Sequence, residues 1–175
     1  KHDGKEMVVT RVRLRLNPQG EANIKYKDLN VYFSNKAVTT PSIGEVREAV
    51  VGIRSGKFPN LDVYGTAGSF FKNPIVTQDV ADKFLHQYPN APHYNAEEGM
   101  VKLSAAWIID HVLGMRGVHE GGVGTWDAQA LVVVNYNHAT SKEIKNFVQK
   151  ISDASVEKIN IALEPEVIIV NKKNN

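Results

Sequence analysis

One run of the sequence gathers the residue types from which a ligand site could be built. Residues 64–74 read Tyr-Gly-Thr-Ala-Gly-Ser-Phe-Phe-Lys-Asn-Pro, so small residues, a hydroxyl, a cation and an amide lie close together. Gly65 and Gly68 allow a positive φ or a close approach of the backbone to a bound group. Ser69 follows where the chain enters an apolar run, and its hydroxyl could be presented to a ligand. From the pattern alone, a glycine turn before a strand is the plainer interpretation.

Two carboxylates flank a proline near the end of the chain, in Glu164-Pro165-Glu166. Residues two apart on an extended strand point to the same face. Proline demotes a strand to the edge of a sheet, so the sequence by itself predicts an edge pair of carboxylates in solvent. The histidines show no paired metal-ligand spacing, and we predict no metal site. They are His2, His86, His93, His111, His119 and His138.

Three basic residues are candidates for binding an anion. Arg54 and Lys57 lie in the last turn of a predicted helix, where a cation either offsets the negative helix end or meets a phosphate. Lys102 stands just before a helix that Ser104 is predicted to cap. That end of a helix prefers anions, so a lysine there is better explained if it and the free N–H groups share one.

Three uncharged polar residues are weaker candidates. Tyr26 lies near a turn, where a lone tyrosine more often packs than binds. Tyr94 lies in the proline-bracketed loop 88–95, and could close over a ligand or pack down. Gln129 could meet a ligand, but a buried glutamine hydrogen-bonded to backbone is nearly as good an interpretation.

The hydrophobic pattern predicts an α+β fold. Residues 8–16 alternate as a half-buried strand does, with an arginine stripe on the outer face that is solvated or meets an acidic partner. Thr40 and Pro41 are expected to open a helix that ends near Gly56. Further strands are expected at 70–76, 101–103, 130–134 and 163–170. Three further helices are expected: one at 78–87 after Thr77, one from residue 105 after Ser104, and one after the capping box Thr140-x-x-Glu143.

Composition excludes several classes of protein. The chain has 175 residues, 42% hydrophobic and 23% charged, as expected of an ordinary soluble globular protein. A net charge of +2 with scattered basic residues does not favour nucleic acid. The absence of cysteine rules out disulfides and thiolate metal sites, and permits a reducing compartment. No apolar run approaches the roughly 20 residues of a membrane helix, and no signal-peptide pattern is present.

Three motifs, in order, resemble the UDP-N-acetylenolpyruvoylglucosamine reductase (MurB) family. They are residues 65–74, Lys-Leu-Ser-Ala-Ala-Trp-Ile-Ile-Asp at 102–110, and Leu-Glu-Pro-Glu-Val at 163–167. The similarity runs from residue 1 to about 170. This flavoenzyme family makes UDP-N-acetylmuramate for bacterial peptidoglycan. NADPH reduces FAD, the reduced flavin passes hydride to the enolpyruvyl double bond, and a serine protonates the resulting carbanion.

The resemblance assigns roles to residues of this chain. Ser69 would be the proton donor and Glu166 the carboxylate that assists the reduction. UDP-N-acetylglucosamine enolpyruvate would be bound by Tyr26, Arg54, Lys57, Gly68, Asn73, Tyr94, Lys102 and Gln129, with Tyr94 as the lid of the longer-chain family members. The chain departs from the family pattern at Lys27, where a glycine is usual, at Trp126, where a histidine is usual, and at Ile168, where an arginine is usual.

The resemblance also implies an organisation. Residues 1–60 would be a remnant of the second lobe of an FAD-binding domain, and 61–175 a small mixed α/β substrate-binding domain whose last strand, 163–170, could return to the first part. The chain starts without Met, and we expect that its beginning has been removed. The family's flavin-binding fold and catalytic arginine precede that point. We therefore expect a chain that does not hold FAD tightly, is inactive alone and has a missing N-terminal FAD-binding domain as partner.

Three functional hypotheses follow, all for a cytoplasmic protein that binds neither nucleic acid nor membrane. The first is an oxidoreductase part that binds the enolpyruvyl UDP-sugar. The second is a UDP-sugar or anion-binding module without redox activity. The third is an α+β interaction domain whose pocket has lost its ligand. Titration with UDP-N-acetylglucosamine separates the third from the others, and NADPH oxidation with the flavin domain added separates the first from the second.

Overall fold

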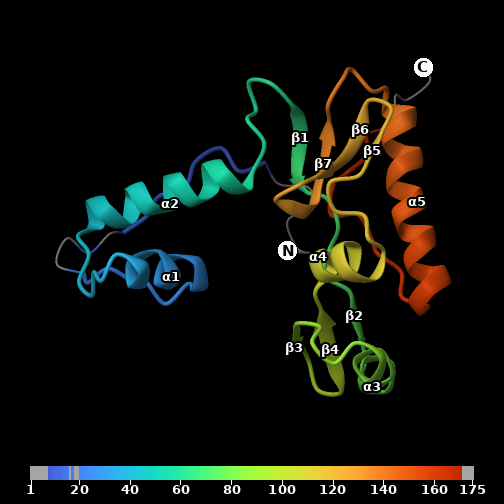
Figure 1. The fold of residues 1–175 in the computed structure, drawn as a ribbon, viewed down its shortest axis with the longest axis horizontal. Helices are drawn as coiled ribbons and strands as arrows, with labels where there is room; N and C mark the ends of the chain where they lie inside the picture. The colour runs from blue at the N-terminus through green and yellow to red at the C-terminus, as the bar shows by residue number, and fades with distance from the viewer. Residues whose placement is uncertain (1–7, 16, 18–19, 171–175) are drawn as a thin grey trace. The chain divides into compact units, whose positions relative to one another are not determined.

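A computed structural model describes residues 8–15, 17 and 20–170 (Figure 1). The chain divides into two compact units, Lys1–Val51 and Gly52–Asn175. The division falls within helix α2 (Ile43–Lys57), whereas the sequence suggested a boundary at residues 60–61, which stays a prediction. The described helices and strands form antiparallel sheets and separate helices, so the α+β class is confirmed.

The first unit contains α1 (Lys27–Asn35) and the greater part of α2. Leu29 and Phe33 are the buried residues of α1, four positions apart on one face of the helix. The predicted start of α2 at Thr40 is wrong. Ser42 caps the helix instead: its Oγ accepts from the Glu45 N–H at 3.2 Å, and the Glu45 carboxylate accepts from the Ser42 N–H at 2.8 Å. This reciprocal capping box satisfies more helix-end donors than a lone threonine would.

The predicted strand at 8–16 does not form within its described residues, 8–15. Val8, Val12 and Leu14, which the alternation placed on a buried face, are each more than 70% exposed. A strand exists only as part of a hydrogen-bonded ladder, and an alternating pattern cannot supply the neighbouring strand.

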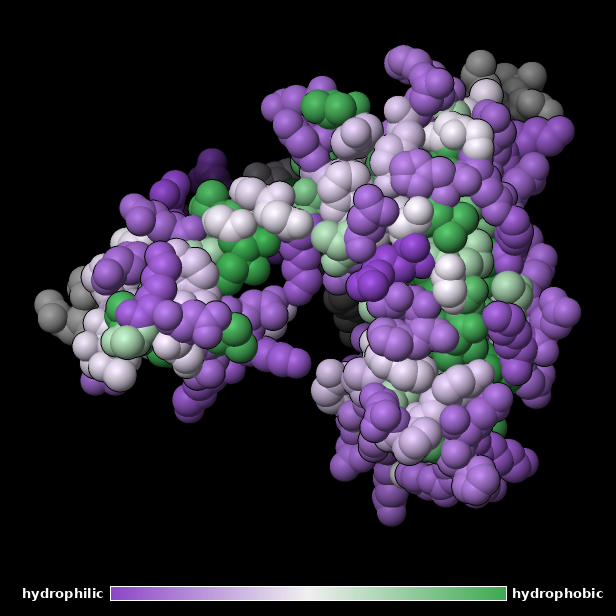
Figure 2. Space-filling view, viewed as in Figure 1, coloured by the Kyte–Doolittle hydropathy of each residue, from purple (hydrophilic) through white to green (hydrophobic). Residues whose placement is uncertain are grey.

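In Figure 2 hydrophilic residues cover most of the visible surface, and apolar residues show as separate patches.

The second unit contains two antiparallel sheets. The larger has the strand order β1-β7-β6-β5, and the smaller has the order β2-β4-β3. The strands of the larger sheet are β1 (Gly65–Ser69), β5 (His119–Glu120), β6 (Val123–Trp126) and β7 (Gln129–Asn135). Those of the smaller sheet are β2 (Ile75–Thr77), β3 (His93–Asn95) and β4 (Met100–Leu103).

The helices of the second unit lie close to where the sequence predicted them, but Thr77, expected to cap the helix at 78–87, makes no side-chain capping hydrogen bond. They are α3 (Gln78–Gln87), the short α4 (Ala105–Trp107), which continues into the π-helix η1 (Ile108–Val112), and α5 (Ser141–Ile159). The predicted cap at Ser104 is confirmed, since its Oγ accepts from the Trp107 N–H at 3.3 Å. The capping box of Thr140 and Glu143 is also confirmed. Hydrogen bonds from Thr140 hold the pKa of the Glu143 carboxyl below its ordinary value.

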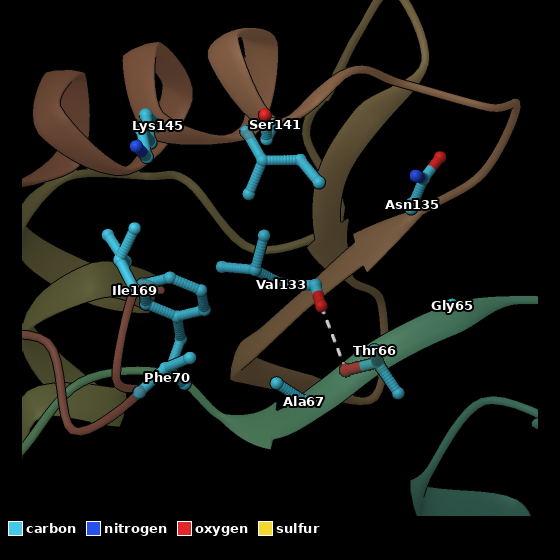
Figure 3. Close-up of a pocket in the computed structure, with 11 residues that line it drawn as sticks. Gly65, Thr66, Ala67, Phe70, Val133, Asn135, Ser141, Lys145 and Ile169 are labelled. Atoms are coloured by element: carbon cyan, nitrogen blue, oxygen red, sulfur yellow. Dashed lines mark hydrogen bonds between the residues drawn. The ribbon is translucent and has the colours of Figure 1, made fainter. Parts of the chain in front are cut away.

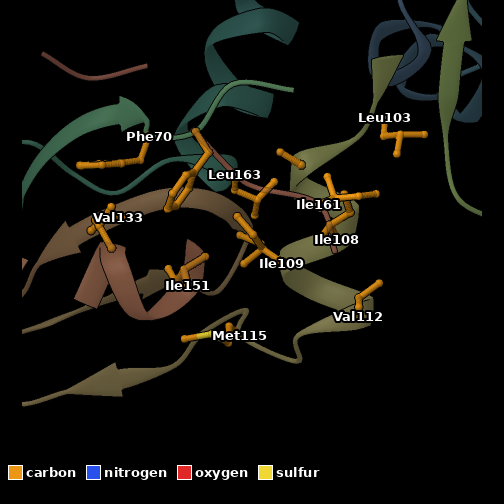
Figure 4. Packing of buried hydrophobic residues seen from close by; sticks show 14 of the residues in the cluster. Phe70, Leu103, Ile108, Ile109, Val112, Met115, Val133, Ile151, Ile161 and Leu163 are labelled. Atoms are coloured by element: carbon orange, nitrogen blue, oxygen red, sulfur yellow. The ribbon is translucent and has the colours of Figure 1, made fainter. Parts of the chain in front are cut away.

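The core of this unit lies between the larger sheet, η1 and the inner face of α5 (Figure 4). Ile108, Ile109 and Ile151 are fully buried. Burying an aliphatic side chain of this size contributes about 1.5–3 kcal/mol, so these residues join α5 firmly to η1 and the sheet. Among the helices of the described residues, none has both the length and the apolar character needed to cross a membrane.

Two predicted strands are corrected. The expected strand 70–76 is broken, because Phe70 and Phe71 turn into the core and β2 begins only after Pro74. The expected strand 163–170 is reduced to a single bridge between Phe71 and Pro165, because proline has no N–H to extend a ladder. Whether residues 163–170 return to the first part of the chain stays a prediction.

Candidate functional site

A bulge in β1 shapes the backbone just before Ser69. The register with β7 shifts between Thr66 and Ser69, and Gly68 has a φ of +78°. The Thr66 hydroxyl donates to the Val133 carbonyl at 2.8 Å (Figure 3) and accepts from the Gly68 N–H at 3.1 Å. Bulges of this kind re-aim the side chain that follows. Ser69 emerges from the bulge exposed rather than sealed in the core.

The segment with Glu166 lies beside the residues that follow Ser69. The Glu166 N–H donates to the Phe70 carbonyl at 2.8 Å, and the Phe70 N–H donates to the Leu131 carbonyl of β7 at 2.8 Å. Glu166 is therefore held across from the residue next to Ser69. Both Ser69 and Glu166 are exposed. The fold thus brings together two segments almost 100 residues apart in sequence.

Lys102 and Tyr94 are neighbours across the smaller sheet. Lys102 is the register partner of Tyr94 in β3 and of Ile75 in β2. Residues directly opposite in antiparallel strands have their side chains on the same face, with Cβ atoms about 5 Å apart. Tyr94 lies in a strand, not in the loop that its flanking prolines suggested, and its side chain is 59% exposed. The half-buried lysine and the exposed tyrosine can therefore contact one ligand.

Asn73 has a structural partner. Its Oδ1 accepts from the backbone N–H of Ala105 at 3.0 Å, which satisfies an unpaired donor at the start of α4. Nearby, the Leu103 N–H donates to the Pro74 carbonyl at 2.9 Å, so the residues around Asn73 and Lys102 are held together by backbone contacts. The amide of Asn73 therefore links the end of the Ser69 stretch to the Lys102 stretch.

Gln129 begins β7 and lies opposite Trp126. Its Oε1 accepts from the Leu131 N–H at 3.5 Å, so the glutamine makes the local backbone contact that was one of its two predicted roles.

Trp126 packs as expected, and its ring centroid lies 5.8 Å from that of Tyr64 and 6.3 Å from that of Tyr136. Burial raises the pKa of the Tyr136 phenol to about 12.

The remaining candidates lie on α2 or next to α1. Arg54 and Lys57 are in the last turn of α2, where cations oppose the helix dipole, and the Arg54 guanidinium lies 4.9 Å from the Phe58 ring centroid. Tyr26 precedes the first residue of α1, in the first unit, and is 63% exposed. Phosphate binding by these residues stays a prediction.

Two pockets of the second unit border the Ser69 stretch. The first, of about 330 Å³, is mostly apolar and contains none of the predicted site residues (Figure 3). The second, of about 540 Å³, includes Asn73 in its wall together with Lys72 and Glu164, whose Nζ and Oε2 lie 3.3 Å apart. The sequence did not predict this ion pair. The only signal for it was a cation and a carboxylate in the two motifs that carry Ser69 and Glu166.

Two glycines of the glycine-rich stretch 117–124 lie close against neighbouring backbone. A Cβ on Gly122 would lie 2.7 Å from the Asn137 carbonyl oxygen, and one on Gly124 would lie within 3.1 Å of the His119 Cα. These glycines therefore allow close packing of backbone on backbone. Within the described ranges there is also no group of three or more histidine, aspartate or glutamate side chains able to hold a metal ion.

These features describe a small α+β domain in which the exposed Ser69 and Glu166 lie on adjacent segments and Lys102 and Tyr94 face each other across the smaller sheet. A family model described as UDP-N-acetylenolpyruvoylglucosamine reductase, C-terminal domain, matches residues 59–170. The chain belongs to this family. The resemblance seen in the three sequence motifs is thereby confirmed.

Curated relatives with the same name give a consistent result. The UDP-N-acetylenolpyruvoylglucosamine reductase of Chromobacterium violaceum is 40% identical over 164 residues, which cover 94% of this chain and 48% of that protein. The reductase of Salmonella typhimurium is 40% identical over 95% of this chain and 47% of its own length. The reductase of Escherichia coli O157:H7 is 37% identical over a stretch that covers 95% of this chain and 48% of that protein. The chain spans about half the length of the curated relatives it matches.

Proposed function

We propose that this chain supplies the substrate-binding part and the proton donor for the NADPH- and FAD-dependent reduction of UDP-N-acetylglucosamine enolpyruvate to UDP-N-acetylmuramate. The reaction belongs to the synthesis of peptidoglycan precursors. Family membership and the names of the relatives support this assignment. The flavin would be held mostly by the part of the relatives that this chain does not cover.

The observation that carries the proposal is the pairing of the Ser69 and Glu166 segments beside a glycine bulge. A reduced flavin, when bound, would supply the hydride. Ser69 would then give its Oγ proton to the carbon that has become basic. A serine hydroxyl is a weak acid, so this step needs a strongly basic acceptor and nearby charges that support the developing anion. Glu166 would lie on the enolpyruvyl side of the same site.

Substrate binding would use the cross-strand pair of Lys102 and Tyr94. The ammonium of Lys102 would meet the uridine monophosphate part, and the exposed ring of Tyr94 would cover it. Gly68, Asn73 and Gln129 would border the sugar and phosphates from the neighbouring strand ends. Arg54, Lys57 and Tyr26 would complete the phosphate contacts, as proposed from the family resemblance.

The test combines this chain with the N-terminal half of the Chromobacterium violaceum reductase and follows NADPH oxidation. Ser69→Ala should lower turnover by about 10²- to 10⁴-fold, the range expected for loss of a general acid. Its affinity for UDP-N-acetylglucosamine should stay within about twofold of wild type, since removing a proton donor spares ground-state binding. Ser34→Ala, at an exposed serine of α1 that lines neither of the two pockets, is the control and should keep full turnover. Full turnover by Ser69→Ala would refute the assignment.

A second candidate function is a UDP-sugar or anion-binding module without redox activity. The half-buried Lys102 beside Tyr94 favours it, because that pair needs no flavin to bind a phosphate and a ring. Binding of UDP-N-acetylglucosamine without any NADPH oxidation in the combined preparation would select this function. We place either activity in the cytoplasm, where a chain without cysteine is at no disadvantage.

A further inference from the structure

The side chain of Trp126 carries a hydrogen-bond donor without a partner among the described residues. Its indole Nε1 is buried, and no acceptor within the described ranges lies in hydrogen-bonding reach of it. A buried donor left unsatisfied destabilises a fold, and native proteins contain few of them. The Trp126 N–H is therefore a candidate donor to a bound molecule.

Two tyrosines fix the orientation of this indole. The Trp126 ring centroid lies 5.8 Å from that of Tyr64 and 6.3 Å from that of Tyr136. The Tyr136 hydroxyl donates to the Thr125 carbonyl at 3.1 Å, which anchors the ring to the neighbouring backbone. A Cβ on Gly124 would lie 3.1 Å from Cε2 of Tyr136, so the glycine lets this ring lie closely over β6. The indole is thus held in place before a ligand binds, and little of its freedom is lost on binding.

The three rings lie on the same face of the larger sheet as the Ser69 side chain. Ser69 of β1 is the register partner of Val132 in β7. Gly124 of β6, beneath the rings, is the register partner of Val134 in the same strand β7. Register partners point to one face of a sheet, as do residues two apart along one strand. Since β7 lies between β1 and β6 and neighbouring strands are about 4.8 Å apart, one UDP-sugar can reach both Ser69 and Trp126.

A neutral acceptor fits this position better than a phosphate oxygen. The pKa of the Tyr136 phenol is raised mainly by burial and secondly by the charge of Asp127, so that carboxylate lies near the rings. It would repel an anionic oxygen at the Trp126 N–H, whereas an amide carbonyl carries no net charge. Aromatic rings also offer an apolar surface on which a methyl group can pack. An N-acetyl group provides both the carbonyl and the methyl.

We propose that Trp126 is a specificity-determining residue whose indole N–H donates to the N-acetyl carbonyl of the UDP-sugar. The rings of Tyr64 and Tyr136 would pack against the acetyl methyl. This role rests on the proposed function, because it concerns the same substrate. It lies outside the three sequence motifs, none of which contains Trp126.

Movement of Gln129 would give the ligand access to the covered N–H. Gln129 lies directly opposite Trp126, across the turn between β6 and β7. Its amide oxygen accepts from the Leu131 N–H at 3.5 Å, longer than the usual length of about 2.7–3.2 Å. The amide can therefore turn toward a ligand at little cost.

The test follows the indole N–H signals of the full chain by NMR. The sequence contains two tryptophans, Trp107 and Trp126, so the ¹⁵N-labelled chain gives two such signals when combined with the unlabelled N-terminal half of the Chromobacterium violaceum reductase. Loss of one signal in Trp126→Phe assigns them. UDP-N-acetylglucosamine should move the Trp126 signal downfield, because its N–H gains an acceptor. UDP-glucose, which has a hydroxyl in place of the N-acetyl group, should leave that signal nearly unmoved.

Calorimetric titration supplies a second measurement. Trp126→Phe should weaken binding of UDP-N-acetylglucosamine by about three- to tenfold, the range of one net hydrogen bond. Its affinity for UDP-glucose should stay within about twofold of wild type. Trp107→Phe, at the other tryptophan, is the control and should change neither affinity by more than about twofold.

Two results would overturn the role of Trp126 and leave the proposed function intact. One is binding of UDP-N-acetylglucosamine without movement of the Trp126 signal, or with the same movement for UDP-glucose. The other is an equal loss of affinity for both UDP-sugars in Trp126→Phe. If the wild-type preparation binds no UDP-N-acetylglucosamine at all, the proposed function itself fails, and the role of Trp126 fails with it.

Discussion

Gly68 is the residue at which a single added methyl group should test the architecture of the site. Its φ of +78° lies in the left-handed region, which residues other than glycine adopt at a cost of about 1–2 kcal/mol. A Cβ built on Gly68 would meet no atom within 4 Å. The whole cost of Gly68→Ala should therefore come from the backbone angle, with no contribution from a clash.

Gly65 offers a matched control in the same strand. Its φ is not in the left-handed region, and its Cβ would lie 3.5 Å from the Asn135 Cβ, an ordinary van der Waals contact. Gly65→Ala should thus change the free energy of unfolding by less than about 0.5 kcal/mol, as is usual for surface substitutions. Gly68→Asn should cost less than Gly68→Ala, because asparagine tolerates the left-handed region better.

Urea unfolding followed by tryptophan fluorescence measures these changes, since Trp107 and Trp126 both lie in the second unit. With an m-value of about 1–3 kcal/mol/M, a loss of about 1–2 kcal/mol lowers the midpoint by about 0.3–2 M for Gly68→Ala. Gly65→Ala should leave the midpoint nearly unchanged. Equal midpoints for the two variants would refute the argument that Gly68 is required for its backbone angle.

Three further predictions concern the core and two titrating groups. Ile151→Ala should lower the free energy of unfolding by about 2–5 kcal/mol in urea, whereas Val156→Ala, at a 45% exposed position of the same helix, should cost far less. The pKa of the Glu143 carboxyl is lowered in the folded state from its ordinary value of 4.5. The ionised carboxylate should therefore stabilise the fold above pH 4.5, and this stabilisation should be lost as the pH falls below that value. Glu143→Gln should remove the corresponding dependence of the thermal midpoint on pH. The pKa of the Tyr136 phenol is raised in the folded state from 10.0 to about 12, so the free energy of unfolding should decrease as the pH rises between those values. Thermal midpoints measured across this pH range should decrease less for Tyr136→Phe than for the wild type.

The elements that the sequence predicted well are those determined by neighbours in the chain. The capping box before α5 and its inner face at Phe147, Val148 and Ile151 follow from spacing alone, and the structure has both. The cap of α4 at Ser104 is equally local. The start of α2 was misplaced by two residues, because Thr40 matches the same cap signal that Ser42 and its partner Glu45 satisfy better.

The predictions that failed depend on residues far away in the sequence. The alternation at 8–15 is a sound strand pattern, but no strand forms there, because alternation says nothing of a partner strand. The expected strand at 163–170 fails for a similar reason: a proline opposite Phe71 limits the ladder to one bridge. The family resemblance pointed to Lys102 and Tyr94 separately, but only the register of β3 and β4 makes them neighbours.

The difference between features set by neighbours in the chain and features set by distant residues also explains how the candidate site is built. Backbone hydrogen bonds and register determine where Ser69, Glu166 and the Lys102–Tyr94 pair lie, whereas side-chain contacts determine how firmly each is held. The serine follows a bulge fixed by two hydrogen bonds of Thr66, so its backbone is rigid. Glu166 is held by the hydrogen bond from its N–H to the Phe70 carbonyl, with Leu163 buried before it and Val167 packed against the core after it, so contacts distant in sequence determine where both groups lie.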